Sequence, residues 1–447
     1  MSPRHFAGAS LLVAALVGTV FLPSALAQGD DLKTAYAKYQ KGRGMLGPWM
    51  AGTKDYEKGN KEHRDAVEGY TRFVVFGNTY RNRLVPKQDP TAEKLLTLAD
   101  EVTRDLEKGM IKAFEMPYGP DLLLAFERSL LKSSKELLDG NTEQYARLNG
   151  SRALPALGIG LGSRTKDNKA VLDLKGQMEI ATGLTSLAND ITAKAFAGNP
   201  RDDGAALYAM RGVKEMYRSL ATTLPLRTDR DKKAGPVSLP QDVEEKNLEL
   251  LASFVLSPPA YLSGALADEI QGYKLLRREA IRALAANGKT KLGKTSPALT
   301  LAKVLTRPRN QANPADSFRL DEQVDAAIGL AQIRLEKDFN SDLAASLVGQ
   351  FLTEYLAQYG DRANAGEMKA FPFAYHAARL NTALSDWSAA PVPGVKLMAQ
   401  KARACLSAME KRDGTAQFQE AELIQTLRKD DQLIKGDAAS KIEFPAN

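Results

Sequence analysis

The sequence has very few of the side chains that build metal and redox centres. Its 447 residues include a single cysteine, Cys405, and three histidines. One cysteine cannot form a disulfide within the chain, so an oxidising compartment would add no covalent cross-link. His63 and His376 lie far apart in the sequence, whereas the ligands of a zinc site are grouped. We therefore expect no metal ion and no cofactor, with His376 packed in the core and His63 exposed.

Aromatic side chains and long apolar runs are also scarce. Aromatic residues make up 7% of the chain, with two tryptophans, Trp49 and Trp387, which argues against a carbohydrate-binding surface. Trp387 is expected to cap the core, and Trp49 is expected to be buried, with a contact to a partner as the alternative. After residue 27 no apolar stretch reaches the ~18 residues of a membrane-spanning helix, so the mature chain is expected to be soluble. The alternating pattern of β-strands is almost absent, and its best example, residues 70–76, fits a helix equally well.

The N-terminus has the pattern of a secretory signal peptide. An apolar run over residues 6–22 is followed by small side chains at Ala25 and Ala27, as a cleavage site requires. We expect residues 1–27 to be removed before Gln28 and the protein to be exported, to the periplasm or outside the cell. The alternative is an uncleaved membrane anchor, which the short apolar run disfavours.

Helical periodicity dominates the rest of the chain. In residues 91–106, for example, Leu95, Leu98, Val102 and Leu106 fall on one face of a helix. The same pattern predicts helices over residues 121–138, 169–196, 203–220, 242–256, 262–286, 298–305, 320–337, 343–359, 373–387 and 395–411. Short loops rich in Gly, Pro and polar residues separate these helices. The predicted fold class is therefore all-α.

Four of the helical segments share a short pattern in which a small residue precedes an aliphatic one. The small positions are Ala153, Gly212, Ala283 and Gly329. Small residues let a neighbouring helix approach closely, as stacked helical repeats require. The spacing between the four segments is irregular, and a chain rich in Ala, Leu and Arg also produces such a pattern by chance.

Two of the segments, Leu275–Leu284 and Leu320–Leu330, resemble the helices of HEAT repeats, in which a charged residue precedes an Ala-rich apolar stripe. Their offset lies in the range of HEAT repeats. The resemblance implies an α-solenoid that binds partners and has no catalytic residues. The predicted organisation is a signal peptide (1–27), N-terminal helices (28–140), an irregular HEAT-like array (141–411) and a polar C-terminal tail (412–447) with a candidate last helix over 417–435.

One segment, Gly288–Thr295, matches the pattern G-x-x-x-x-G-K-[ST] of phosphate-binding loops. Phosphate binding by such a loop needs a buried strand before the loop and a helix after it. Residues 277–286 have the pattern of an amphipathic helix instead, so we interpret the segment as a basic loop between two helices. Residues 158–162 match part of a dinucleotide-binding loop, but Ser163 stands where the third glycine is required.

The most pronounced charge feature of the sequence is basic. Residues 274–309 contain ten Lys and Arg side chains and one acid, a formal charge of +9 in a chain of +7 overall. Gathered on one face, these charges would attract anions. The predicted contact residues are Arg277, Arg278, Arg282, Lys289, Lys291, Lys294, Arg307 and Arg309. The alternative is a solvated basic surface without a ligand.

The predicted function is a non-catalytic, exported scaffold that binds a protein partner through this basic patch. An acidic partner would match its charge, and an anionic envelope polymer or a membrane surface are further candidates. Nucleic acid is disfavoured because aromatic residues do not alternate with the basic ones. Two other functions stay open: a helical binder of a small ligand in an apolar cavity, and an enzyme whose acid–base residues meet only in the fold.

Overall fold

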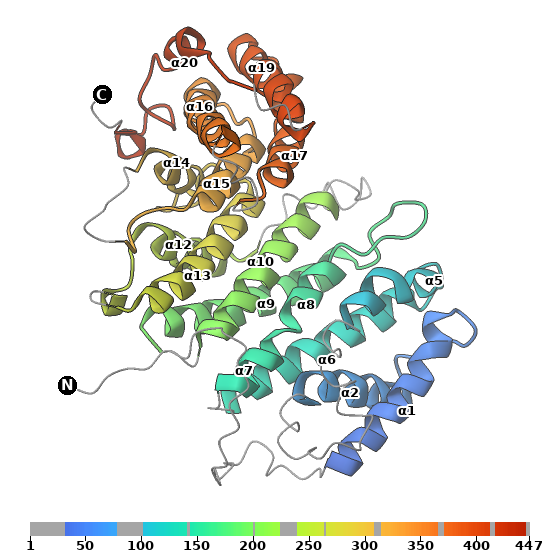
Figure 1. The fold of residues 1–447 in the computed structure, drawn as a ribbon. Coiled ribbons are helices and arrows are strands. Elements are labelled where there is room, and N and C mark those ends of the chain that lie inside the picture. The colour runs from blue at the N-terminus through green and yellow to red at the C-terminus, as the bar shows by residue number, and fades with distance from the viewer. Residues whose placement is uncertain are drawn as a thin grey trace, which may run out of the picture. The chain divides into compact units, whose positions relative to one another are not determined.

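The computed structural model describes residues 32–77, 102–140, 144–199, 202–223, 239–262, 265–307, 314–364, 371–411 and 416–443. Helices make up nearly all of the regular structure in these residues, and the β-type pairs among them are isolated bridges. The protein is therefore all-α, as predicted (Figure 1). In chain order the helices are α1 (Leu32–Met50), α2 (Lys61–Phe76), η3 (Asp105–Gly109), α5 (Ile111–Phe114), α6 (Gly119–Gly140), α7 (Gln144–Ser151), α8 (Leu154–Gly160), α9 (Leu174–Phe196), α10 (Asp203–Thr223), α12 (Gln241–Leu256), η5 (Ala260–Leu262), α13 (Ala267–Asn287), α14 (Pro297–Thr306), α15 (Leu320–Gln332), α16 (Ser341–Asn364), α17 (Phe373–Ala383), α18 (Ser385–Ser388), α19 (Pro393–Glu410), α20 (Ala421–Leu427) and η7 (Ala438–Ser440).

The chain divides into two compact units, Met1–Asn247 and Leu248–Asn447. This division falls inside α12, whereas the sequence predicts a boundary at residue 140. The predicted signal peptide, residues 1–27, and most of the predicted helix 91–106 lie outside the described residues. Among the helices that are described, none combines the length and the apolar character that a membrane crossing requires.

In the first unit, α6 is the helix on which the others are assembled. It contacts α2, α7, α8 and α9. Its apolar side chains recur at helical spacing, so that Leu122, Phe126, Leu130 and Leu137 form one stripe and are all buried. The predicted core position of Trp49, at the end of α1, is also confirmed.

Glycines bring pairs of helices to very short separations in both units. A Cβ atom at Gly212 of α10 would lie 3.0 Å from the Leu154 carbonyl oxygen of α8. In the second unit, a Cβ atom at Gly329 of α15 would lie 2.7 Å from the Cβ atom of Ala285 on α13. The expectation that these small residues permit close helix approach is confirmed at Gly212 and Gly329.

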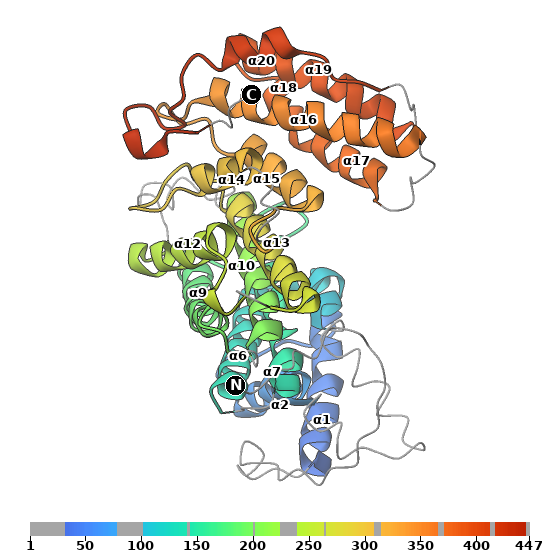
Figure 2. The same ribbon diagram turned by 60° about the vertical axis from the view of Figure 1, so that its left-hand side comes forward.

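Helix α15 is the central element of the second unit. It contacts α13, α14, α16 and α17, and in Figure 2 α16 lies above it and α17 to its right. Every residue from Glu322 to Ala331 is buried. A helix surrounded on all sides normally carries apolar residues throughout. Because α15 also buries Glu322 and Asp325, each of these carboxylates requires a partner of opposite charge.

Most predicted helices occur, with ends that local chemistry explains. The helix predicted over 169–196 begins only at Leu174, because the Asp173 side chain caps its first turn by accepting a hydrogen bond from a backbone N–H. The helix predicted over 373–387 is divided at Leu384 into α17 and α18.

The C-terminal segment is more than a polar tail. Only Ala421–Leu427 of the candidate helix 417–435 is α-helical. Phe418, Leu433 and Ile442 are buried. The segment therefore contributes apolar side chains to the core of the second unit.

One carboxyl group in the first unit is buried without a partner among the described residues. Glu127 of α6 is completely inaccessible, and in that part of the chain neither of its oxygens has a hydrogen-bond partner. It lies against Gly160 of α8, where a Cβ atom would come within 1.9 Å of Oε1. Burial raises the pKa of Glu127 well above its usual range, which favours the protonated, neutral form.

We expect Glu127→Gln to stabilise the first unit by an amount that grows with pH. Because the pKa of Glu127 is raised in the folded state, the unfolded chain releases this proton first, near pH ~4.3. Above that pH the native stability falls by up to about 1.4 kcal/mol per pH unit, until the folded-state pKa is reached. Hydrogen exchange of the α6 amides over a pH series measures this difference. Glu57→Gln, on the surface, is the control, and a pH-independent difference between the native protein and the Glu127→Gln variant would contradict the assignment.

Candidate functional site

The predicted contact residues do not share one surface. Three arginines lie on α13 and face α15, three lysines lie in the loop between α13 and α14, and one arginine follows α14. They are, in that order, Arg277, Arg278 and Arg282, then Lys289, Lys291 and Lys294, then Arg307. Arg309 lies outside the described residues.

Arg277 forms a completely buried ion pair with Glu322 of α15, and both side chains are 0% exposed. Its Nε and Nη2 atoms donate to the two carboxylate oxygens at 2.7 and 2.9 Å. The guanidinium also donates to the carbonyls of Ala315 and Ser317 and lies 4.4 Å from the centre of the Phe318 ring. Burial alone would lower the pKa of Arg277, but the bonds to Glu322 outweigh it and raise the pKa, so the pair stays charged.

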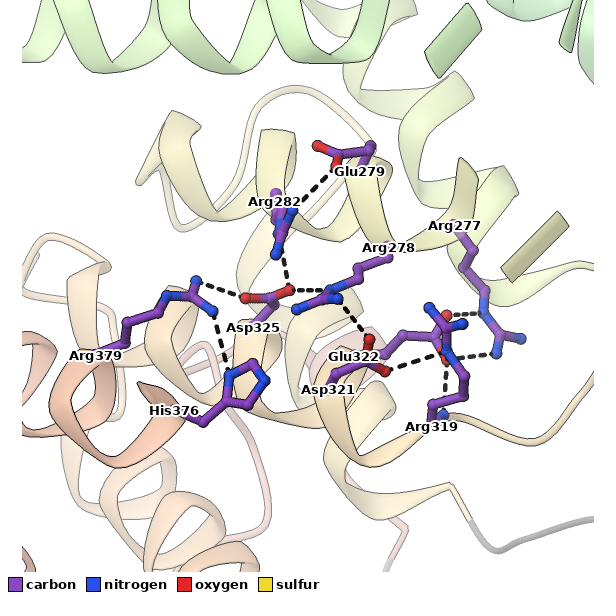
Figure 3. Close-up of polar contacts among 10 residues, drawn as sticks. All are labelled: Arg277, Arg278, Glu279, Arg282, Arg319, Asp321, Glu322, Asp325, His376 and Arg379. Atoms are coloured by element: carbon purple, nitrogen blue, oxygen red, sulfur yellow. Dashed lines mark hydrogen bonds and ion pairs between the residues drawn. The ribbon is translucent and has the colours of Figure 1, made fainter. Parts of the chain in front are cut away.

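Asp325 is the centre of a second cluster, which joins three helices (Figure 3). Its carboxylate is 1% exposed and accepts hydrogen bonds from Arg278 and Arg282 of α13, at 2.7 and 2.8 Å. Arg379 of α17 donates to the other oxygen at 2.6 Å. Burial alone would raise the pKa of Asp325, but the charges of these arginines lower it below its usual range. One ionised carboxylate therefore holds α13 and α17 against α15.

His376 lies beside this cluster as a buried, neutral side chain. Its Nδ1 atom is 3.5 Å from Nη1 of Arg379, and its ring is stacked on Phe371 with the centres 4.9 Å apart. Burial, together with the charges of Arg278 and Arg379, lowers the pKa of His376 to about 4. The prediction that it is a packing residue in the core is confirmed.

These contacts correct the predicted basic patch. Arg277 is predicted on a contact surface, but it has no accessible surface, and a partner could not reach it. Arg278 and Arg282 are mostly buried, and carboxylates of α15 balance their charges. The acids come from residues 316–325, directly after the basic segment. The helical fold brings the two segments together, because a guanidinium is buried only with a partner of opposite charge.

Two of the three loop lysines differ from the arginines, because they line a pocket of about 270 Å³ in the second unit. Lys291 and Lys294 of the loop line it together with Lys303 of α14, and the acids in the lining are Glu249 and Asp437. Hydroxyl groups complete the lining, from Ser253, Ser257, Thr295, Ser296 and Thr300. We call this site the lysine pocket, and its lining carries one more positive than negative charge.

Of the remaining predicted residues, Lys289 and Arg307 do not line the lysine pocket. Arg307 donates to the Leu256 carbonyl at 2.8 Å and lies 3.4 Å from Asp316. The lysine pocket includes Lys303, which is not among the contact residues predicted from the sequence. The sequence does contain a signal for Lys303, because this residue belongs to the same basic segment, residues 274–309.

The loop that contains these lysines does not have the structure of a phosphate-binding loop. Helix α13 leads into it, and Gly288 ends that helix in the left-handed conformation, with φ at +67°. The N–H groups of Leu292 and Thr295 donate to each other's carbonyls, which closes a tight turn. The interpretation as a basic loop between two helices is confirmed.

The described part of the chain favours neither a metal site nor a reactive thiol. In those residues, no group of three or more His, Cys, Asp or Glu side chains could hold a metal ion. Cys405 is half-buried, and its Sγ atom lies 3.1 Å from the Gln417 carbonyl oxygen. Burial and the charge of Glu420 raise the pKa of the Cys405 thiol, which favours its unreactive form.

Comparison with protein-family models, with curated proteins and with solved structures finds no match for this chain. Its function is therefore inferred from its own residues.

Proposed function

We propose that this protein is an exported, non-catalytic scaffold that holds an acidic segment of a partner protein at the lysine pocket. The observation that carries the proposal is the convergence of Lys291, Lys294 and Lys303 on one pocket with a positively charged lining. Ammonium groups attract carboxylates, and nearby hydroxyl groups can donate further hydrogen bonds to them.

The size of the lysine pocket favours a single side chain of a larger partner over a free ligand. Pockets for small molecules typically measure ~300–1,000 Å³, and the lysine pocket measures about 270 Å³. Lys291 already binds a carboxylate here, with its Nζ atom 2.7 Å from Oδ2 of Asp437. Lys294 and Lys303 are exposed at the same site, so a Glu or Asp side chain of a partner can make the same kind of contact with them.

One feature of the structure and one of the sequence support the wider proposal. The close helix contacts at Gly212 and Gly329 are those that stacked helices need, which favours a HEAT-like arrangement. The signal-peptide pattern of residues 1–27 favours export.

The test is a fluorescence-anisotropy titration of the protein with a labelled Glu-rich peptide. We expect Lys294→Gln combined with Lys303→Gln to weaken peptide binding about fivefold to thirtyfold. The double variant removes two ion pairs, and an exposed ion pair contributes up to about 1 kcal/mol. Added salt should weaken the native binding as well, since both groups are accessible to solvent.

The matched control is Lys337→Gln combined with Lys396→Gln, which removes the same charge from exposed positions outside the pocket lining. Equal weakening by the two pairs would reduce the effect to general charge attraction and reject the lysine pocket. Binding to vesicles of phosphatidylglycerol, without binding to the peptide, would replace the protein partner by a membrane surface.

A further inference from the structure

A second pocket, of about 410 Å³, lies in the first unit, lined by α2, α6 and the loop that precedes α2. The apolar part of its lining consists of Val67, Leu124 and Ala125. Its volume is in the range of sites for small molecules, ~300–1,000 Å³. The polar groups in the lining therefore decide which molecule it would accept.

Most of the charged side chains around this pocket have partners within the protein. Three of the four lining cations are paired with carboxylates: Lys58 with Asp121, Lys132 with Glu68, and Arg128 with Glu179. The fourth cation, Arg64, donates through Nη1 to the carbonyls of Lys58 and Gly59, at 3.1 and 3.2 Å. Among the described residues Arg64 forms no ion pair, so its charge is the one that a ligand could balance.

Tyr56 adds a buried hydroxyl group without a hydrogen-bond partner among the described residues. The side chain is 4% exposed, and its ring is fixed edge-on against Trp49, with the centres 5.3 Å apart. Burial raises the pKa of Tyr56, and Asp121 and Arg64 are the charged groups that act on the phenol. Tyr56 itself lines the pocket together with Arg64 and Asp121, so its phenol belongs to the same site as the Arg64 guanidinium.

The neighbouring His63 is predicted as an exposed residue of a polar helix, and the structure corrects this. Its ring lies 4.7 Å from that of Trp49, and its Nδ1 atom accepts a hydrogen bond from the Glu57 N–H at 3.0 Å. Together with Trp49 it holds Tyr56 in place, so the unpartnered hydroxyl is fixed and not free to turn to solvent.

We infer that this pocket binds a small monocarboxylate with an apolar body. The carboxylate would pair with Arg64 and accept the hydrogen bond of the Tyr56 hydroxyl, which otherwise stays unmade. The apolar body would cover Val67 and Leu124. The inference goes beyond the proposed function, because it assigns a ligand to the first unit, whereas the lysine pocket belongs to the second.

The probe is octanoate, with 1-octanol as its uncharged control, and calorimetry on the full chain measures the binding. We expect octanoate to bind about tenfold more tightly than octanol or better, because hydrogen bonds to charged groups are the stronger ones. Equal affinity for the two probes, or no binding of octanoate, would overturn the inference.

Tyr56→Phe removes the hydroxyl and keeps the ring. We expect octanoate to bind about twofold to tenfold more weakly, as for the loss of one hydrogen bond. The melting temperature should stay the same or rise, because the hydroxyl has no partner among the described residues. A Tyr56→Phe variant that melts earlier would show that the hydroxyl serves the fold, which contradicts its role as a ligand contact.

Arg64→Gln should weaken octanoate binding about tenfold, and Arg64→Lys should restore most of it, because the charge is kept. The matched control is Arg128→Gln, which removes a lining arginine that is already paired with Glu179 and should change the affinity by less than about twofold. Equal losses from Arg64→Gln and Arg128→Gln would reject the site. The substitutions Lys294→Gln and Lys303→Gln should leave octanoate binding unchanged, so that the two proposals succeed or fail separately.

Discussion

Asp325→Ala is expected to destabilise the second unit by about 3–5 kcal/mol, because it removes one partner from a buried ionic cluster. Arg278 would keep only its ion pair with Asp321 and Arg282 only that with Glu279. Arg379 would have no ion pair left among the described residues. Each guanidinium is mostly buried, so water could replace the lost contact only in part. The effect should extend over α13, α15 and α17, since Asp325 joins all three.

Hydrogen exchange of the amides in these three helices measures the loss. Asp338→Ala is the matched control, since it removes an exposed aspartate from the same unit and should change stability by less than about 0.5 kcal/mol. The pKa of Asp325 is lowered in the folded state, so its contribution is present above pH ~4 and is lost as the pH falls further. A loss confined to α15, or equal in the two variants, would contradict the role given to Asp325.

The second large effect is expected at the Arg277–Glu322 pair. Arg277→Met or Glu322→Leu alone should cost about 3–5 kcal/mol, because each leaves a completely buried charge without its partner. The double variant should be more stable than either single variant, since no unpaired charge remains and apolar side chains fill the space. Its recovery should be incomplete, because the carbonyls of Ala315 and Ser317 lose their donor.

A double-mutant cycle, with hydrogen exchange of α13 and α15 as the readout, gives the interaction energy directly. If the double variant loses as much stability as the two single variants together, the side chains act independently. That result would rule out the pair as described.

Helix positions follow from the sequence because they depend on local patterns. The apolar stripe of α10 and the Pro297 start of α14 are visible in the sequence, and both helices occur close to their predicted bounds. Helix α15 is predicted for the same reason, but its position at the centre of the second unit is not. A pattern of apolar residues shows one buried face, whereas burial on all sides depends on which other helices pack around it.

The surroundings of the basic residues are harder to predict. The net charge of a sequence segment does not show which acidic side chains of a neighbouring helix lie opposite it in the fold. Residues 274–309 carry +9, but Asp321, Glu322 and Asp325 lie on the facing helix α15 and balance the arginines of α13. The residue types do indicate which of these basic side chains are buried and which stay accessible. Arginine is the usual partner in a buried ion pair, and lysine usually stays in water. Arg277 and Lys291 follow this rule, since the first is buried and the second lies at a pocket.

The sequence predicts Lys291 and Lys294 as contact residues, but it predicts neither the other side of the lysine pocket nor the Tyr56 site. Asp437 and Lys291 meet across 146 positions of the chain. Tyr56 and Asp121 belong to segments that the sequence shows no reason to pair. Such contacts depend on tertiary packing, for which helical periodicity gives no information.

The most direct test compares two pairs of substitutions in the basic segment, residues 274–309. One pair, Arg278→Gln with Arg282→Gln, removes charge from the ionic network, and the other, Lys294→Gln with Lys303→Gln, removes it from the lysine pocket. We predict that the arginine pair lowers the exchange protection of α13 and α15 and leaves the affinity for the Glu-rich peptide within about twofold. The lysine pair should weaken peptide binding and leave the exchange protection of both helices unchanged. A folded arginine variant that loses the peptide, beside a lysine variant that keeps it, would contradict the division of the basic segment into a structural network and a binding pocket.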